Sequence, residues 1–440
     1  MNTSTKFFIQ TLGCRCNQAD SAAIREGLHR YSMRECVSAS DADLIVVNTC
    51  TVTHRSDQQA RQAIRKLIRE NPNARVVITG CYAERDPKTL AAIPGVGLII
   101  GNADRDRLPE IVGNPKQKFE NPILMSPLDS LVHCPVLPMG YTGGKTRPLV
   151  KIQDGCDARC SYCIVPKVRG PGRSARPEDI LAEIKSLVDQ GFQEIVLTGV
   201  HLGTYGRKSK DRVRLVGLLR KIAGIEGLGR IRLSSIEPML FDRAIVRIAA
   251  DSTVFAHHFH IPIQSGSDRI LRRMHRPYKA SRFRELVLHI HEEIPDAGIG
   301  TDVLTGFPGE TDRDFAETLH LIRELPLAYL HVFPYSPREG TEAYAFADRV
   351  PAETVKKRRE ALLEISAAKS LAFRRQFIGH TLPAITLSKE EELGASMVLT
   401  GNYIHAKVQA HKVAPNRLVD VRIEDVKPEV TLARISHKDS

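Results

Sequence analysis

Three cysteines lie close together near the middle of the chain, in the segment DGCDARCSYCIVP at residues 154–166. Cys156, Cys160 and Cys163 have the spacing C-x3-C-x2-C and follow an apolar run that reads as a buried strand. A structural zinc site needs four ligands, and no second cysteine or histidine pair lies nearby in the sequence. A thioredoxin-like redox pair leaves the third cysteine unexplained, and three structural cysteines are the remaining alternative. An iron–sulfur cluster held by three thiolates fits the count best, because one iron then stays open for a substrate or cofactor.

Three further cysteines, Cys14, Cys50 and Cys81, each stand where a predicted strand ends. Apolar runs at 7–13, 43–48, 75–80 and 97–101 alternate with amphipathic segments such as 57–71. This pattern predicts an open parallel α/β sheet. The carboxyl ends of parallel strands meet at one edge of such a sheet, so the three distant thiols can converge. Three thiols at one edge again indicate a cluster with an open iron.

The middle and the end of the chain predict two further architectures. Six apolar runs alternate with helical segments, at 149–155, 194–199, 230–235, 259–264, 299–306 and 329–335. They predict a partial (β/α)6 TIM-like barrel with its site at the carboxyl ends of the strands. A long basic helix is expected at 354–377. Beyond it, the runs at 381–387, 403–410 and 417–426 predict a small antiparallel β-barrel.

The composition sets broad limits on the class of protein. The 440 residues are enough for two or three domains, and the net charge of +12 points to a polyanionic partner. No apolar run approaches the roughly 18 residues of a membrane span, and no secretory signal is evident. We therefore expect a cytoplasmic protein with no membrane partner, in which nine cysteines argue against a disulfide framework.

These motifs together resemble the radical S-adenosylmethionine (SAM) methylthiotransferases. The C-x3-C-x2-C motif with Tyr162 before its last cysteine is the signature of radical SAM enzymes. The segments TLGCRCNQAD, NTCTVTHRSDQQARQAIR and GCYAERDP look most like the subgroup acting on N6-threonylcarbamoyladenosine in tRNA. The resemblance covers nearly the whole chain. It implies a methylthiotransferase domain at 1–115, a linker at 116–141, a radical SAM core at 142–372 and a TRAM-like RNA-binding barrel at 373–440.

The resemblance also implies the cofactors and partners. Two [4Fe-4S] clusters are expected, one on Cys156, Cys160 and Cys163 and an auxiliary one on Cys14, Cys50 and Cys81. In this superfamily the amino acid end of SAM binds the open iron of the first cluster, and cleavage of SAM yields a 5′-deoxyadenosyl radical. The expected reaction is methylthiolation of carbon 2 of the base next to the anticodon. The expected partners are tRNA, SAM, a reducing electron-transfer protein and a sulfur source.

Residues at the other strand ends are candidate cofactor or substrate contacts. Thr198 and Gly199 stand where the superfamily keeps a glycine-containing loop near the amino group of SAM, although this chain lacks the common Gly-Gly-Glu. The remaining candidates are polar or aromatic: Tyr162, Ser235, Glu237, Gln264, Ser265 and Asp302. The alternative is that such residues cap the helices that follow the strands.

Several alternatives remain open from the sequence. A sister enzyme could act on isopentenyladenosine in tRNA or on an aspartate of a ribosomal protein. A non-catalytic iron–sulfur protein that binds tRNA is the alternative from another class. The seven basic residues within 269–285 either guide tRNA phosphates or form a solvated helix face. Cys16, Cys36 and Cys134 have no partner in the motif pattern, and we assign them no role.

Overall fold

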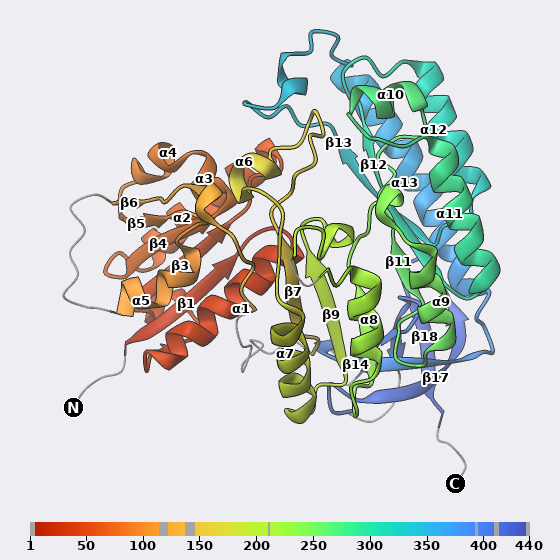
Figure 1. Cartoon of the computed structure of the whole chain (residues 1–440), viewed down its shortest axis with the longest axis horizontal. Coiled ribbons are helices and arrows are strands. Elements are labelled where there is room, and N and C mark those ends of the chain that lie inside the picture. Colours follow the sequence, from red (N-terminus) through yellow and green to blue (C-terminus); the bar gives the residue numbers. More distant parts are fainter. Residues whose placement is uncertain are drawn as a thin grey trace. The chain divides into compact units, whose positions relative to one another are not determined.

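The structure is a computed structural model that describes residues 5–113, 122–136, 146–209, 212–391, 395–408 and 413–436. It divides into two compact units. Figure 1 shows the ribbon of the whole chain. The first unit comprises residues 1–143, 151–176 and 336–344, and the second comprises 144–150, 177–335 and 345–440. The chain passes from the second unit back to the first within strand β7 (Leu149–Asp154).

The first unit is built on a parallel sheet with the strand order β2-β1-β3-β4-β5-β6. Alternate residues of strand β3 (Leu44–Thr49) point to opposite faces, as strand geometry requires. Ile45 and Val47 pack in the core that contains Ile64 of helix α2 (His54–Glu70). Leu44 and Val46 pack in the other core, which contains residues of helices α1 (Arg15–Arg30) and α5 (Leu108–Gly113). The predicted parallel α/β domain is therefore confirmed.

The first unit contains further strands and three short helices. The strands are β1 (Lys6–Thr11), β2 (Arg34–Glu35), β4 (Arg75–Gly80), β5 (Val96–Ile100), β6 (Ile123–Leu124) and β8 (Arg173–Ser174). The helices are α3 (Cys81–Arg85), α4 (Pro87–Ala91) and α6 (Val165–Arg169). Strand β8 pairs antiparallel with the end of β7.

The second unit contains parallel strands that follow one another in chain order. They are β9 (Glu194–Gly199), β10 (Arg230–Leu233), β11 (His258–His260), β12 (Gly298–Thr305) and β13 (Tyr329–Pro334). The amide of Val196 donates to the Pro148 carbonyl at the entry of β7, and that of Ile236 donates to His260. The helices between and after them are α7 (Pro177–Asp189), α8 (Leu215–Ala223), α9 (Arg243–Asp251), α10 (Asp268–Arg273), α11 (Ala280–Glu293) and α12 (Asp312–Glu324). This is the predicted partial β/α barrel.

The second unit ends in a long helix and a small closed barrel. Helix α13 (Ala352–Arg375) is basic, and among the helices of the described residues none is long and apolar enough to cross a membrane. The barrel has the order β14-β15-β16-β18-β17 and a core that includes Val398, Val421 and Ile423. Its strands are β14 (Thr381–Glu391), β15 (Ala395–Thr400), β16 (His405–Val408), β17 (Leu418–Val426) and β18 (Thr431–Ile435). The predicted C-terminal barrel is confirmed, with one parallel pair, β16 with β18.

The strand predicted at 259–264 is much shorter in the structure. The run at 259–264 forms a strand only as β11, which ends at His260. Pro262 follows two residues later, and proline has no backbone N–H to donate to a neighbouring strand. Gln264 then adopts a φ of 70° and makes only an isolated bridge to Val303. The candidate residue Gln264 therefore lies beyond β11, at an isolated bridge to β12.

Candidate functional site

Cys14, Cys50 and Cys81 follow three adjacent strands of the first unit. They stand after β1, β3 and β4, which are neighbours in the sheet (Figure 1). All three therefore lie at its carboxyl edge. A Cβ placed on Gly13 would lie 2.5 Å from Cys50 Cβ and 2.9 Å from Cys50 Sγ. The turn that carries Cys14 therefore touches Cys50. The structure brings the three predicted thiols to one place, as expected for parallel strands.

Two buried asparagines hold this edge of the sheet in shape. The Asn17 side chain donates to the carbonyls of Leu12 and Thr49 at 2.8 and 2.9 Å. The Asn48 side chain donates to the Asn17 carbonyl and to Ser21 Oγ at 2.9 and 3.0 Å. These bonds satisfy backbone groups at the strand ends and fix the start of α1 against β3. The loops that carry Cys14 and Cys50 are thereby locked together.

The thiols differ in how readily they ionise. A hydrogen bond from Cys16 is the main cause that lowers the pKa of Cys14 to about 6. Burial raises the pKa of Cys50 to about 12. Burial also raises the pKa of Cys81, against the opposing effect of Arg169. Metal ligation requires thiolates, so a metal centre at this edge must compensate the cost of burying their charge.

A buried cluster of charges surrounds the edge and carries a positive excess. Arg169 of α6 donates through Nε to Cys81 Sγ at 3.3 Å. Its other nitrogens pair with Asp20 and Asp154, both at 2.9 Å. The same two carboxylates are also paired with Arg105, Lys151 and Arg173. Arg105 also pairs with Asp106 at 3.4 Å, so these four cations face three carboxylates and leave one positive charge, which suits an anionic cluster held by three thiolates. The residues present therefore fit a cluster.

The C-x3-C-x2-C loop belongs to the same unit. The Cys156 amide donates to the Gly170 carbonyl and the Cys163 amide to the Cys160 carbonyl, both at 3.0 Å. Gly155 precedes the loop with a φ of 69°, where a side chain would collide with the Pro171 carbonyl. All three thiols are partly exposed. The loop is therefore a tight, backbone-bonded turn that carries three partly exposed cysteines.

The two cysteine sets are linked through helix α6. The loop runs directly into α6, and Ile164 and Val168 form an apolar cluster with Cys81. Asn102 Nδ2 also donates to the Val168 carbonyl at 2.6 Å. Arg169, at the end of the same helix, reaches Cys81. One short helix thus connects the C-x3-C-x2-C loop to the thiols at the sheet edge.

Sequence reasoning missed a buried arginine that supports Cys50. Arg338 is 2% exposed and donates to Thr51 Oγ1 at 2.6 Å and to Asp57 Oδ2 at 2.7 Å. Thr51 follows Cys50 directly, so a segment almost 290 residues later in the chain fixes the Cys50 loop. No local pattern in the sequence marks Arg338, because its partners are distant in the chain.

The remaining candidates divide between the two units. Tyr162 is partly buried in the first unit. Thr198 is buried at the end of β9 beside the half-buried Gly199, and Ser235 is exposed after β10. Ser265 is buried and accepts from the Ser267 amide at 3.2 Å, a local turn bond two residues along the chain. Helix α10 begins after Ser267 and has no side-chain cap, so Ser265 does not cap it.

Two acidic candidates of the second unit have cationic or imidazole partners. Glu237 pairs with the buried Arg276 at 2.7 Å. Burial raises the pKa of Glu237, and Arg276 opposes this rise. Asp302 accepts from His260 and His331 at 2.8 and 3.1 Å. Burial would raise the pKa of Asp302, but these histidines hold it below its ordinary value. Asp302 is therefore an ionised carboxylate.

Much of the basic stretch at 269–285 is engaged within the protein. Four of its seven basic side chains form ion pairs, namely Arg269 with Asp314, Arg273 with Asp348, Arg276 with Glu237 and Arg284 with Glu324. Arg272 and Lys279 are exposed, and Arg282 is partly exposed. The phosphate-guiding role considered for this stretch is thus left to these three side chains.

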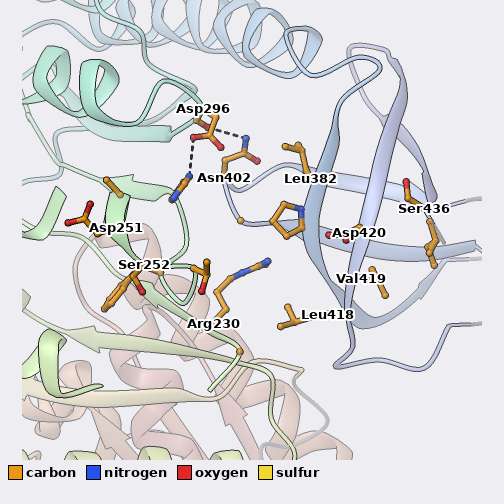
Figure 2. A pocket seen from close by; sticks show the side chains of 18 residues that line it. Arg230, Asp251, Ser252, Asp296, Leu382, Asn402, Leu418, Val419, Asp420 and Ser436 are labelled. Atoms are coloured by element: carbon orange, nitrogen blue, oxygen red, sulfur yellow. Dashed lines mark hydrogen bonds and ion pairs between the residues drawn. The ribbon is translucent and has the colours of Figure 1, made fainter. Parts of the chain in front are cut away.

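A separate pocket of about 970 Å³ lies in the second unit (Figure 2). It is lined by residues at the amino ends of β10, β11 and β12 and by residues of the C-terminal barrel. His257 Nδ1 lies 3.0 Å from Asp296 Oδ1, and Asn402 donates to the Asp296 carbonyl. Asp251, Asp296 and Asp420 give the lining an acidic character that does not favour a phosphate backbone. Active sites of β/α barrels lie at the opposite, carboxyl ends of the strands.

Comparisons with known proteins agree with this architecture. Residues 150–322 match the Radical SAM superfamily, and residues 6–101 match Uncharacterized protein family UPF0004. The threonylcarbamoyladenosine tRNA methylthiotransferase MtaB of Bacillus subtilis is 34% identical, with 94% of this chain and 92% of that protein covered. The tRNA-2-methylthio-N(6)-dimethylallyladenosine synthase of Thermobifida fusca is 34% identical, with 89% and 79% covered.

A solved structure supports the fold. The radical SAM methyltransferase TsrM of Kitasatospora setae superposes with a TM-score of 0.56 over 76% of this chain and 75% of that protein. The two sequences are 16% identical, so the likeness concerns the fold.

The cysteine loop, the parallel barrel and the superfamily match define a radical SAM enzyme, a class that uses SAM and a [4Fe-4S] cluster. Within this class, the chain belongs to the tRNA methylthiotransferase family. It is an enzyme that transfers a methylthio group to tRNA. The sequence-based assignment to this family is confirmed.

Proposed function

We propose that the enzyme methylthiolates carbon 2 of N6-threonylcarbamoyladenosine next to the anticodon, using two [4Fe-4S] clusters. The proposed substrate is supported by the similarity of this chain to proteins that are named for it. Those of Bacillus subtilis, Aquifex aeolicus and Chlamydia pneumoniae are 33 to 36% identical over 92 to 98% of this chain. The observation that supports the second cluster is the meeting of Cys14, Cys50 and Cys81 at one sheet edge.

The substrate explains why two clusters are needed. Carbon 2 of adenine carries an unactivated C–H bond that a side-chain base cannot deprotonate at neutral pH. When bound, the cluster on Cys156, Cys160 and Cys163 together with SAM supplies the radical chemistry, and the cluster on Cys14, Cys50 and Cys81 supplies sulfur. A second SAM is the methyl source.

The protein's own residues hold these groups and compensate their charge. Arg169 donates to Cys81 and adds positive charge beside the sheet-edge thiols. Asp20 and Asp154 fix the Arg169 guanidinium in place. Arg169 is the last residue of α6, the helix that follows Cys163. Its position therefore depends on the folding of the C-x3-C-x2-C loop. Assembly of the two sites is thereby coupled through α6.

The remaining candidate contacts complete the proposal. Tyr162, Thr198, Gly199, Ser235, Glu237, Gln264, Ser265 and Asp302 are assigned to SAM or substrate. The C-terminal barrel is assigned to tRNA binding, in keeping with the net charge of +12. A reducing electron-transfer protein and a sulfur source complete the set of partners.

Isopentenyladenosine in tRNA is the second candidate substrate. Relatives named tRNA-2-methylthio-N(6)-dimethylallyladenosine synthase are 31 to 36% identical to this chain. The alignments cover 82 to 97% of this chain, compared with 92 to 98% for the proteins named for threonylcarbamoyladenosine. An isopentenyladenosine substrate is therefore the alternative, and overall identity alone does not separate the two.

Nucleoside analysis of tRNA distinguishes these substrates. Cells that lack the gene are expected to lose 2-methylthio-N6-threonylcarbamoyladenosine and to accumulate its unmethylthiolated precursor, with 2-methylthio-isopentenyladenosine unchanged. Re-expression of the wild-type gene should restore the product, and the Cys160→Ala gene should not. Retention of the threonylcarbamoyl product in the deletion strain would contradict the assigned substrate.

A further inference from the structure

Two histidines and an aspartate from three neighbouring strands converge in the second unit. His260 ends β11, Asp302 lies in β12 and His331 lies in β13. His260 Nε2 and His331 Nδ1 lie 2.8 and 3.1 Å from the same oxygen, Asp302 Oδ1. One ligand atom from each residue lies within 4.8 Å of the other two. These distances are short enough for the three side chains to share one cation.

The cluster is supported on one side and open on the other. The side chains of His260, Asp302 and His331 are 11%, 22% and 53% exposed. A ligand from solvent can therefore reach His331, while His260 is held from behind. A site with this asymmetry can keep a coordination position for an exchangeable ligand.

A tyrosine fixes the orientation of His260. Tyr329 Oη lies 3.1 Å from His260 Nδ1 and 2.9 Å from His258 Nε2. The His258 ring in turn stacks on Tyr403 with a centroid distance of 4.1 Å. Histidines that bind metals commonly use their second ring nitrogen in this way, which sets the tautomer.

We propose that His260, Asp302 and His331 bind a divalent transition-metal cation of the zinc type. Two imidazoles and one carboxylate are the donor set that suits zinc, and three protein ligands leave a position open. That position takes an anionic oxygen, and the candidate is the carboxylate of the threonyl group on the substrate base. Binding of the threonyl carboxylate at this position rests on the proposed function, whereas the metal site itself does not.

Zinc titration of the holoenzyme tests the site. Anaerobically reconstituted protein is treated with a chelator that spares its clusters, and Zn²⁺ uptake is followed by calorimetry and metal analysis. We expect one zinc per chain, with affinity reduced at least about tenfold in His331→Gln and Asp302→Asn. Tyr329→Phe should weaken binding about tenfold while preserving all three ligands.

A matched pair and a second cation provide the controls. His257 lies 3.0 Å from Asp296, which gives a histidine–carboxylate pair in the same unit without the second histidine. His257→Gln should leave zinc affinity unchanged. Co²⁺ should give ligand-field bands of nitrogen and oxygen ligands without thiolate charge-transfer bands. Wild-type protein that takes up no zinc, equal affinity in all variants, or thiolate bands that persist in His331→Gln would each overturn the site.

RNA binding tests the use of the open position separately. We measure the affinity of an anticodon stem-loop with N6-threonylcarbamoyladenosine and of one with unmodified adenosine, with and without Zn²⁺. Zinc should tighten only the modified RNA, and His331→Gln should abolish the gain. An equal effect on both RNAs would overturn the carboxylate contact. If the substrate is another base, the zinc titration above still reports on the metal site.

Discussion

Arg169 Nε donates to Cys81 Sγ at 3.3 Å, although the two residues are 88 positions apart in the chain. Arg169 also pairs with Asp20 and Asp154, so its guanidinium is fixed before any cluster binds. A thiolate that accepts a hydrogen bond is stabilised as an anion, and such bonds help to set the reduction potential of iron–sulfur clusters. The contact therefore links the α6 segment to the electronic properties proposed for the sheet-edge site.

Replacement of Arg169 by lysine should alter the sheet-edge cluster more than the protein's stability. Lysine keeps the charge but cannot reproduce the forked contacts of arginine to Cys81, Asp20 and Asp154. We expect a lower reduction potential of the auxiliary cluster and a loss of activity of about tenfold. The potential is read by redox titration with electron paramagnetic resonance.

Arg105→Lys is the matched control for this prediction. Arg105 is equally buried, but its ion pairs are with the carboxylates of Asp20, Asp106 and Asp154 rather than with a thiol. It should shift stability without shifting the potential. An unchanged potential in Arg169→Lys, or an equal shift in both variants, would show that the Cys81 contact has no electronic role.

A methyl group at Gly13 should disrupt the sheet-edge site. Gly13 has a φ of 104°, and a Cβ there would lie 2.5 Å from Cys50 Cβ. Gly13→Ala is expected to lose the auxiliary cluster and to cost about 1 to 3 kcal/mol for crowding, in addition to about 1 to 2 kcal/mol for the left-handed backbone. Gly191 has a φ of 90° with no atom within 4 Å of an added Cβ, so Gly191→Ala isolates the backbone cost. Iron content and denaturant unfolding measure both effects, and full iron content in Gly13→Ala would contradict the expectation.

Glu194 should stabilise the second unit in a pH-dependent manner. Its fully buried carboxylate lies 2.8 Å from Arg232 and 3.4 Å from Arg147 and Arg230. Burial would raise the pKa of Glu194, but the three arginines hold it below its ordinary value. The stabilisation is therefore complete above the unfolded-state pKa of about 4.3, and it is lost as the pH falls through the lower folded-state pKa.

Glu194→Gln measures the stabilisation that the ionised Glu194 carboxylate contributes. At pH 7 it should lower the free energy of unfolding by roughly 3 to 5 kcal/mol, because three arginines, two of them buried, lose their counter-charge. The difference from wild type should shrink as the pH is lowered from about 5 towards 3. The exposed Glu226 offers a control, and Glu226→Gln should change stability by less than about 0.5 kcal/mol. A difference that is constant with pH would exclude an ionised Glu194 as its source.

The sequence predicted the elements and the meeting of the thiols because both follow from local rules. Apolar runs and their spacing define parallel strands, and parallel strands place their carboxyl ends together, so Cys14, Cys50 and Cys81 were expected at one edge. The short β11 departs from this rule because Pro262 lies within the apolar run and ends the pairing. Local patterns thus carry most of the fold.

The charged groups around the thiols could not be predicted in this way. Arg169 and Arg338 contact residues between 88 and 287 positions away, and long-range pairing leaves no periodic signal in the sequence. The stretch at 269–285 shows the converse. Its basic residues form a dense local pattern, yet Arg276 is buried against Glu237 because charge density alone does not report burial. The partners of charged residues in such networks become known only from the folded structure.

The most direct test of the two-cluster proposal is a count of clusters in reduced wild-type and Cys50→Ala protein. Anaerobically reconstituted wild type should hold about eight irons per chain and show two paramagnetic clusters on reduction. Cys50→Ala should hold about four irons, retain SAM cleavage and lose methylthiolation, whereas Cys36→Ala should match wild type. Wild-type protein with about four irons, or two intact clusters in Cys50→Ala, would contradict the proposal that Cys14, Cys50 and Cys81 hold a second cluster.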